Sequence, residues 1–106
     1  MTFAVPLPAA RAIARLGQDI SKARRRRRLT QASLAERSGI SLATLKRLEK
    51  GGSRVAVEVL ARTLYVLGEV ERLERLLDTG EDEVGLALMD EQLPKRVRHS
   101  RSPGAP

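Results

Sequence analysis

Apolar residues recur at helical spacing along the first part of the chain. A stripe at steps of three and four residues, which places its members on one helix face, consists of Ile13, Leu16, Ile20 and Ala23. Because proline suits the first turn of a helix, we expect this helix to begin near Ala9, after Pro6 and Pro8. We expect it to end within the arginine run 24–28, since cations are favoured at a helix C-terminus. Gly17 interrupts the stripe, and a break in the helix is an alternative there.

Four shorter helices are predicted after this one, separated by capping residues and glycines. Their expected ranges are 31–38, 42–50, 55–67 and 70–77. Thr30 and Ser41 stand at N-cap positions, where a hydroxyl oxygen accepts a hydrogen bond from an exposed backbone N–H. Gly39 is expected to end the second helix in a left-handed conformation. Because no long stretch alternates with the period of a strand, we predict an all-α protein.

The most informative segment is residues 29–51, LTQASLAERSGISLATLKRLEKG. Two short helices joined by a tight turn that contains glycine form a helix-turn-helix. The residues expected to lock the two helices together are Ala35, Ile40, Leu45 and Leu48. With the two leucines inward, the residues that point outward are Ala43, Lys46, Arg47 and Lys50, with Leu42 and Thr44 on the flanks. Cations beside small side chains suit a helix that enters a DNA major groove, which is about 12 Å wide.

The same segment resembles the Cro and phage-repressor type of helix-turn-helix, the Xre family. The matching residues are Leu29-Thr30-Gln31, Leu34-Ala35, Ser38-Gly39-Ile40-Ser41, Thr44-Leu45 and Leu48-Glu49-Lys50-Gly51, and the resemblance covers roughly residues 16–77. It implies a compact five-helix repressor-type domain in which Arg24 and Glu49 pair to join the first and third helices. It also implies that a homodimer binds a palindromic operator.

The resemblance also implies roles for individual residues in binding DNA. Gln31 and Ser41 would contact DNA phosphates, and Thr44 would face the DNA backbone. Base edges would be read by Leu42, Ala43 and Arg47. The full predicted DNA-contacting set is Arg28, Gln31, Ser41, Leu42, Ala43, Thr44, Lys46, Arg47 and Lys50. The family often carries polar residues where Leu42 and Ala43 stand, so readout here would depend on contact with thymine methyl groups.

Net charge is distributed unevenly along the 106 residues. Residues 1–77 carry sixteen basic and seven acidic side chains, residues 78–91 six acidic ones only, and residues 92–106 four basic ones only. A basic domain indicates an anionic partner. The first helix could also lie on a membrane surface, but it lacks the bulky anchors Trp and Phe.

Enzyme chemistry is not expected from this composition. With no Cys and a single His in a polar tail, the chain offers no nucleophile and base pair, and we predict no cofactor and no metal. No apolar run is long enough to span a membrane, and a cytoplasmic location is expected.

Three parts of the chain are predicted. They are an N-terminal extension of the first helix (1–14), the helix-turn-helix DNA-binding domain (15–77), and an acidic segment with a basic tail (78–106) that is flexible or binds a partner. We predict a sequence-specific transcriptional regulator, specifically a repressor. The run 41–49 and the basic tail resemble HipB-type antitoxins, which repress their own operon and bind a HipA-like kinase toxin. The alternative is a toxin-neutralising interaction module with little sequence-specific DNA binding.

Overall fold

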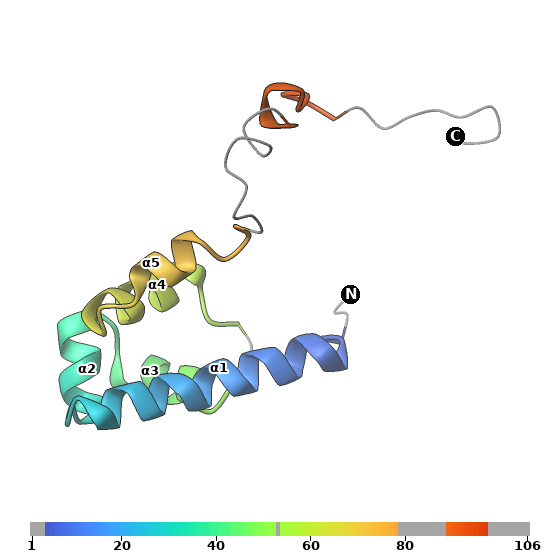
Figure 1. The fold of residues 1–106 in the computed structure, drawn as a ribbon. Helices are drawn as coiled ribbons and strands as arrows, with labels where there is room; N and C mark the ends of the chain where they lie inside the picture. The colour runs from blue at the N-terminus through green and yellow to red at the C-terminus, as the bar shows by residue number, and fades with distance from the viewer. Residues whose placement is uncertain (1–3, 53, 79–88, 98–106) are drawn as a thin grey trace. The chain divides into compact units, whose positions relative to one another are not determined.

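The structure, a computed structural model, describes residues 4–52, 54–78 and 89–97. Its helices are α1 (Leu7–Arg26), α2 (Gln31–Ser38), α3 (Leu42–Glu49), α4 (Val57–Val66) and α5 (Val70–Glu74), as Figure 1 shows. None of the described residues lies in a strand. The all-α prediction is therefore confirmed, with five helices in the predicted order.

The first helix begins two residues earlier than predicted and continues past Gly17 without a break. Pro6 is its N-cap, and its first turn holds a second proline. Gly17 is buried because α1 crosses the end of α3 at this point. A β-carbon on Gly17 would collide with the backbone oxygen of Leu48 and lie 2.7 Å from that of Glu49. Glycine is needed here for a close approach between helices, so the alternative of a break at Gly17 is wrong.

The helix-turn-helix caps form as predicted. The Thr30 hydroxyl oxygen accepts from the backbone N–H of Ser33 (3.0 Å), and the Ser41 hydroxyl oxygen accepts from that of Thr44 (3.1 Å). Gly39 has a φ of 70° and ends α2 in the left-handed region. The backbone therefore leaves α2 and enters α3 through a turn whose hydrogen bonds are local.

Four predicted boundaries of α3, α4 and α5 are wrong by one to three residues, and one of them is the end of α4, where Leu67 is the C-cap. Lys50 is the C-cap of α3, because the following Gly51 has a φ of 74° and ends the helix. At the start of α4, Val55 packs against the core but precedes the helix, which begins at Val57 after the N-cap Ala56. The last helix is shorter than predicted, since α5 ends at Glu74 and the chain continues in turns.

The hydrophobic core lies where helices α1 to α4 meet, with contacts between α2 and α4, α1 and α3, and α2 and α3. Its buried residues are Ile20, Leu34, Ala35, Leu45, Leu48 and Leu67. The inward positions predicted from helical periodicity in α2 and α3 are thus confirmed. Because the apolar side of α3 is fully used in this core, its other side is left to solvent.

The chain divides into two units, Met1–Leu76 and Leu77–Pro106. The first holds all five named helices. In the second, residues 89–91 form a single helical turn, followed by a turn at residue 92 and a bend at 95–96. Most of the predicted acidic segment, residues 79–88, and the end of the basic tail lie outside the described residues.

Candidate nucleic-acid interface

The second helix of the helix-turn-helix, α3, presents one continuous polar face. Leu45 and Leu48 are buried against α1 and α2, which fixes the rotation of the helix about its axis. The residues on the opposite side are exposed, as predicted: Ala43, Lys46, Arg47 and Lys50. Leu42 is 39% exposed at one flank, and Thr44 is half-buried at the other. The structure therefore brings the predicted DNA-contacting side chains of α3 and its C-cap onto one surface, while their contact with DNA remains a prediction.

Hydrogen bonds organise the first turns of this face. The Ser41 hydroxyl donates to the Thr44 hydroxyl oxygen (2.7 Å) while its own oxygen caps the helix. Arg47 donates to the same Thr44 oxygen through Nη2 (3.4 Å), so its guanidinium lies along the N-terminal half of α3. Among the described residues, Lys46 has no carboxylate within 4.0 Å. Both cations are therefore available to an anionic or polar ligand.

An ion pair joins α3 to α1 at the end of this face. Nε of Arg24 donates to Oε2 of Glu49 (2.8 Å), and Nη2 donates to Oε1 (3.1 Å), so the pair is bidentate. The side chains are only 12% and 6% exposed. Arg24 also donates to the backbone oxygen of Leu29 (2.8 Å) at the entrance to α2. The predicted pair is confirmed, and it holds α3 against α1.

Gln31 takes part in the same network. Its side-chain amide donates to Oε1 of Glu49 at 3.1 Å, and the residue is half-buried. Gln31 was predicted to bind phosphate. In the structure one of its N–H groups is directed to a carboxylate inside the domain. It therefore helps to position α3, and phosphate contact by its remaining groups stays a prediction.

Arg28 occupies a backbone conformation that arginine rarely adopts. Its φ is 55°, and its N–H donates to the oxygen of Arg25 (3.0 Å) while that of Leu29 donates to the oxygen of Arg24 (3.1 Å). This is the Schellman arrangement, in which glycine is the usual residue. A strained non-glycine residue persists where its side chain or surroundings require it. Arg28 is exposed just before α2 begins, at the edge predicted to meet phosphate.

Arg54 is a residue that sequence reasoning missed. It is exposed in the connection between α3 and α4 and has a φ of 67°. Nothing in the local sequence predicts this conformation, because a cation in a loop is ordinary and arginine disfavours positive φ. The structure therefore adds a third cation, beside Arg28 and Lys50, at the margins of the helix-turn-helix.

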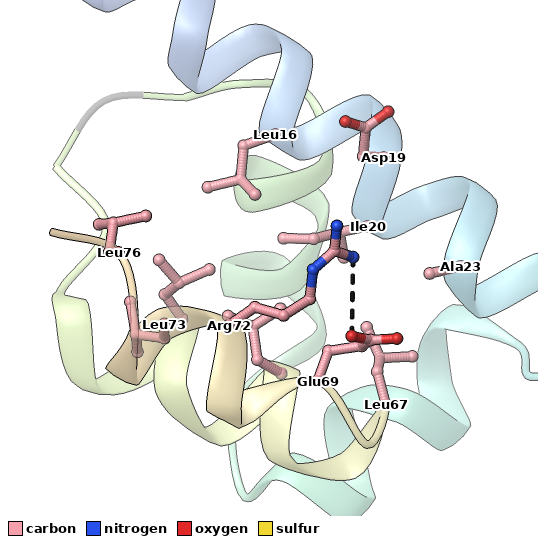
Figure 2. Close-up of a pocket in the computed structure, with 11 residues that line it drawn as sticks. Leu16, Asp19, Ile20, Ala23, Leu67, Glu69, Arg72, Leu73 and Leu76 are labelled. Carbon is pink, nitrogen blue, oxygen red and sulfur yellow. Dashed lines mark ion pairs between the residues drawn. The ribbon is translucent and has the colours of Figure 1, made fainter. Parts of the chain in front are cut away.

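Away from this face, α1, α4 and α5 enclose an apolar groove. Its volume is about 260 Å³, and its leucine lining comprises Leu16, Leu60, Leu64, Leu67, Leu73 and Leu76. Figure 2 shows Asp19 and Arg72 among the charged residues of the lining, with Arg72 paired to Glu69 (3.6 Å). Leu76 is 73% exposed. The groove is formed without residues of α2 or α3, so it and the polar face of α3 are separate surfaces.

Comparison with known proteins identifies the domain. The model of the helix-turn-helix family, Cro/C1 type, matches residues 20–64, which run from the middle of α1 into α4. This segment is a helix-turn-helix domain of the Xre family, and the protein is a DNA-binding transcription regulator in the general sense of that family. The match is to the family as a whole and does not identify a subtype. A comparison with curated proteins found no match. Of the helices that the structure describes, none has the length and apolarity to cross a membrane.

Proposed function

We propose that the protein is a sequence-specific DNA-binding repressor whose α3 enters the major groove. The observation that carries this proposal is the exposed face of α3, where Arg47 and Lys46 lie next to the small side chain of Ala43. A guanidinium can donate two parallel hydrogen bonds to O6 and N7 of guanine, whereas an ammonium suits a single phosphate. We assign Arg47 to a base edge, Lys46 to phosphate, and Leu42 with Ala43 to close approach and thymine methyl contact.

We propose that four further residues contact the DNA backbone on either side of α3. Arg28, Ser41, Thr44 and Lys50 lie at the ends of α2 and α3, where phosphate contacts set the register of a helix-turn-helix on DNA. A single α3 covers too few base pairs to define a site in a genome. We therefore propose a two-fold homodimer with half-sites about 34–36 Å apart.

The apolar groove between α1, α4 and α5 is our assignment for the dimer contact. Three features support a second copy as its occupant. First, the lining of the groove is largely leucine. Second, Leu76 is exposed to solvent at the edge of the groove. Third, the groove carries Asp19 and Arg72, opposite charges that a two-fold axis could bring together. Both copies of α3 would stay free to bind DNA, because the groove uses neither α2 nor α3.

Selection of bound duplexes from a random library, followed by footprinting, tests the proposed function. The expected result is a palindrome with two protected half-sites about one helical turn apart. Recovery of no preferred sequence would refute sequence-specific repression and favour the alternative, an interaction module. Protection of one isolated half-site would keep DNA reading but refute the dimer.

The antitoxin role is a further part of this proposal. It rests on the resemblance of residues 41–49 and on the acidic and basic segments after residue 77. Removing residues 79–106 should leave DNA binding nearly unchanged and abolish binding to a HipA-like kinase encoded in the same operon. Undiminished capture of that kinase by the shortened protein would refute the assignment of the tail to a partner.

A further inference from the structure

The solvent face of α1 forms a second basic surface. Its members follow one another at alternating steps of four and three residues and are all exposed: Arg11, Arg15, Gln18, Lys22 and Arg25. This set is called the α1 stripe below. At a rise of about 1.5 Å per residue, it extends for about 21 Å along the helix. Four of its five side chains are cations, so the stripe is a row of positive charge on a rigid element.

The opposite side of α1 is committed to the core. Ile20 is 2% exposed, Leu16 packs against the core cluster, and Gly17 is pressed against the end of α3. A helix that binds a membrane surface inserts an apolar face between lipids. Since the apolar face of α1 is covered by its own domain, the stripe can recognise a partner through charge alone.

Little of this charge is neutralised within the part of the chain that the structure describes. Arg15 pairs with Asp19 at 3.4 Å, but both side chains are more than half exposed, and such pairs are weak. Nε of Arg25 donates to the backbone oxygen of Ser21 (3.4 Å), which leaves its charge in place. No carboxylate of the described residues lies within 4.0 Å of the charged groups of Arg11 or Lys22.

We propose that the α1 stripe binds the phosphate backbone of duplex DNA beside the base pairs that α3 reads. The stripe leads directly into Arg26 and Arg28, and from there into the start of α2, which is the edge assigned to phosphate. Its length corresponds to about six base pairs at 3.4 Å each. This inference rests on the proposed function. It predicts that affinity depends on DNA outside the selected sequence.

The test compares two duplexes and two variants. The short duplex contains only the base pairs for which selection shows a preference, and the long duplex adds about ten base pairs on each side. The stripe variant carries Arg11→Gln, Lys22→Gln and Arg25→Gln. The matched control carries Arg37→Gln, Arg62→Gln and Arg75→Gln, which remove the same charge from exposed positions on other elements. Melting temperatures of both variants confirm that the domain is folded.

Fluorescence anisotropy at salt concentrations from about 50 to about 200 mM gives the slope of log affinity against log salt. Each lost phosphate contact should reduce this slope by about 0.9, equivalent to about 3.5-fold in affinity across that range. We expect the stripe variant to lose about 2.7 in slope on the long duplex and almost nothing on the short one. The control variant should show the same change in slope on the long duplex as on the short one.

Equal losses on both duplexes, or losses no greater than the control's, would overturn the proposal. Binding of the wild-type protein to phosphatidylserine-rich vesicles, lost in the stripe variant, would assign the stripe to membranes and also overturn it. The two proposals fail separately. If the wild-type protein does not distinguish the selected duplex from a scrambled one, the proposed function is refuted. If the loss in the stripe variant does not depend on duplex length, the proposal for the α1 stripe is refuted.

Discussion

Replacing Glu49 with alanine should remove the connection that holds α3 in place. The carboxylate accepts two hydrogen bonds from Arg24 and one from Gln31, at 2.8 to 3.1 Å. After the substitution the Arg24 guanidinium, whose side chain is 12% exposed, has no carboxylate beside it. The perturbation therefore combines the loss of an ion pair with the burial of an uncompensated charge.

The magnitude follows from the burial of the pair. Removing one partner of a buried ion pair costs about 3–5 kcal/mol. Arg24 keeps its hydrogen bond to the backbone oxygen of Leu29, so we expect about 3 kcal/mol, at the lower end. A domain of this size has a free energy of unfolding of about 4–11 kcal/mol, and each kcal/mol lost lowers its melting temperature by about 4–8 °C. The Glu49→Ala protein should melt about 12–24 °C lower than wild type.

The chain offers a matched control. Glu58 and Arg62 pair at 2.9 Å, close to the 2.8 Å of Arg24 and Glu49, but their side chains are 72% and 51% exposed. An exposed pair four residues apart on a helix contributes about 0.3–0.5 kcal/mol. Glu58→Ala should thus cost about 0.5 kcal/mol. The comparison separates the effect of burial from that of distance.

Urea unfolding followed by circular dichroism measures these differences, and a double-mutant cycle isolates the pair. Arg24→Leu, Glu49→Leu and their combination should give a coupling energy of at least about 2 kcal/mol. A cost below about 1 kcal/mol for Glu49→Ala, or a coupling energy near zero, would show that the pair does not position α3.

Three further predictions address the fold, the strained cation and the dimer. Alanine in a helix is normally more stable than glycine by about 1 kcal/mol, but Gly17→Ala should destabilise by about 1–3 kcal/mol in urea unfolding, because its β-carbon meets the end of α3. A Gly17→Ala protein more stable than wild type would contradict the close approach of α1 to the end of α3. Arg28→Gly should raise the free energy of unfolding by about 1 kcal/mol by relieving its positive φ and should reduce the salt slope of DNA binding by about 0.9; an unchanged slope would remove Arg28 from the interface. Leu76→Glu should yield a monomer in sedimentation equilibrium, and a persistent dimer would place the contact elsewhere.

Features that depend on neighbouring residues could be predicted from the sequence. The caps at Thr30 and Ser41 and the left-handed Gly39 are local hydrogen-bond chemistry, which is visible in the residue types themselves. The inward positions of Leu45 and Leu48 follow from helical periodicity, and the exposed face of α3 follows from them. The pairing of Arg24 with Glu49, 25 positions apart, came instead from resemblance to the family.

Features that depend on how elements meet could not be predicted in this way. Gly17 was interpreted as a possible break because its reason for being glycine lies in α3, not in α1. The amide of Gln31 turns toward Glu49 only because the ion pair places a carboxylate there. The positive φ values of Arg28 and Arg54 run against residue preference, so no propensity argument would find them.

The central claim is that Arg47 reads a base and Lys46 binds phosphate, and one measurement tests it most directly. The dissociation constants of wild type, Arg47→Ala and Lys46→Ala are determined on the selected duplex and on a scrambled duplex of equal length. Arg47→Ala should cost about 1–3 kcal/mol on the selected duplex only and relax the preference at one base pair. Lys46→Ala should weaken binding to both duplexes equally and lower the salt slope by about one. Small and equal losses for both variants on both duplexes would contradict the assignment of sequence reading to α3.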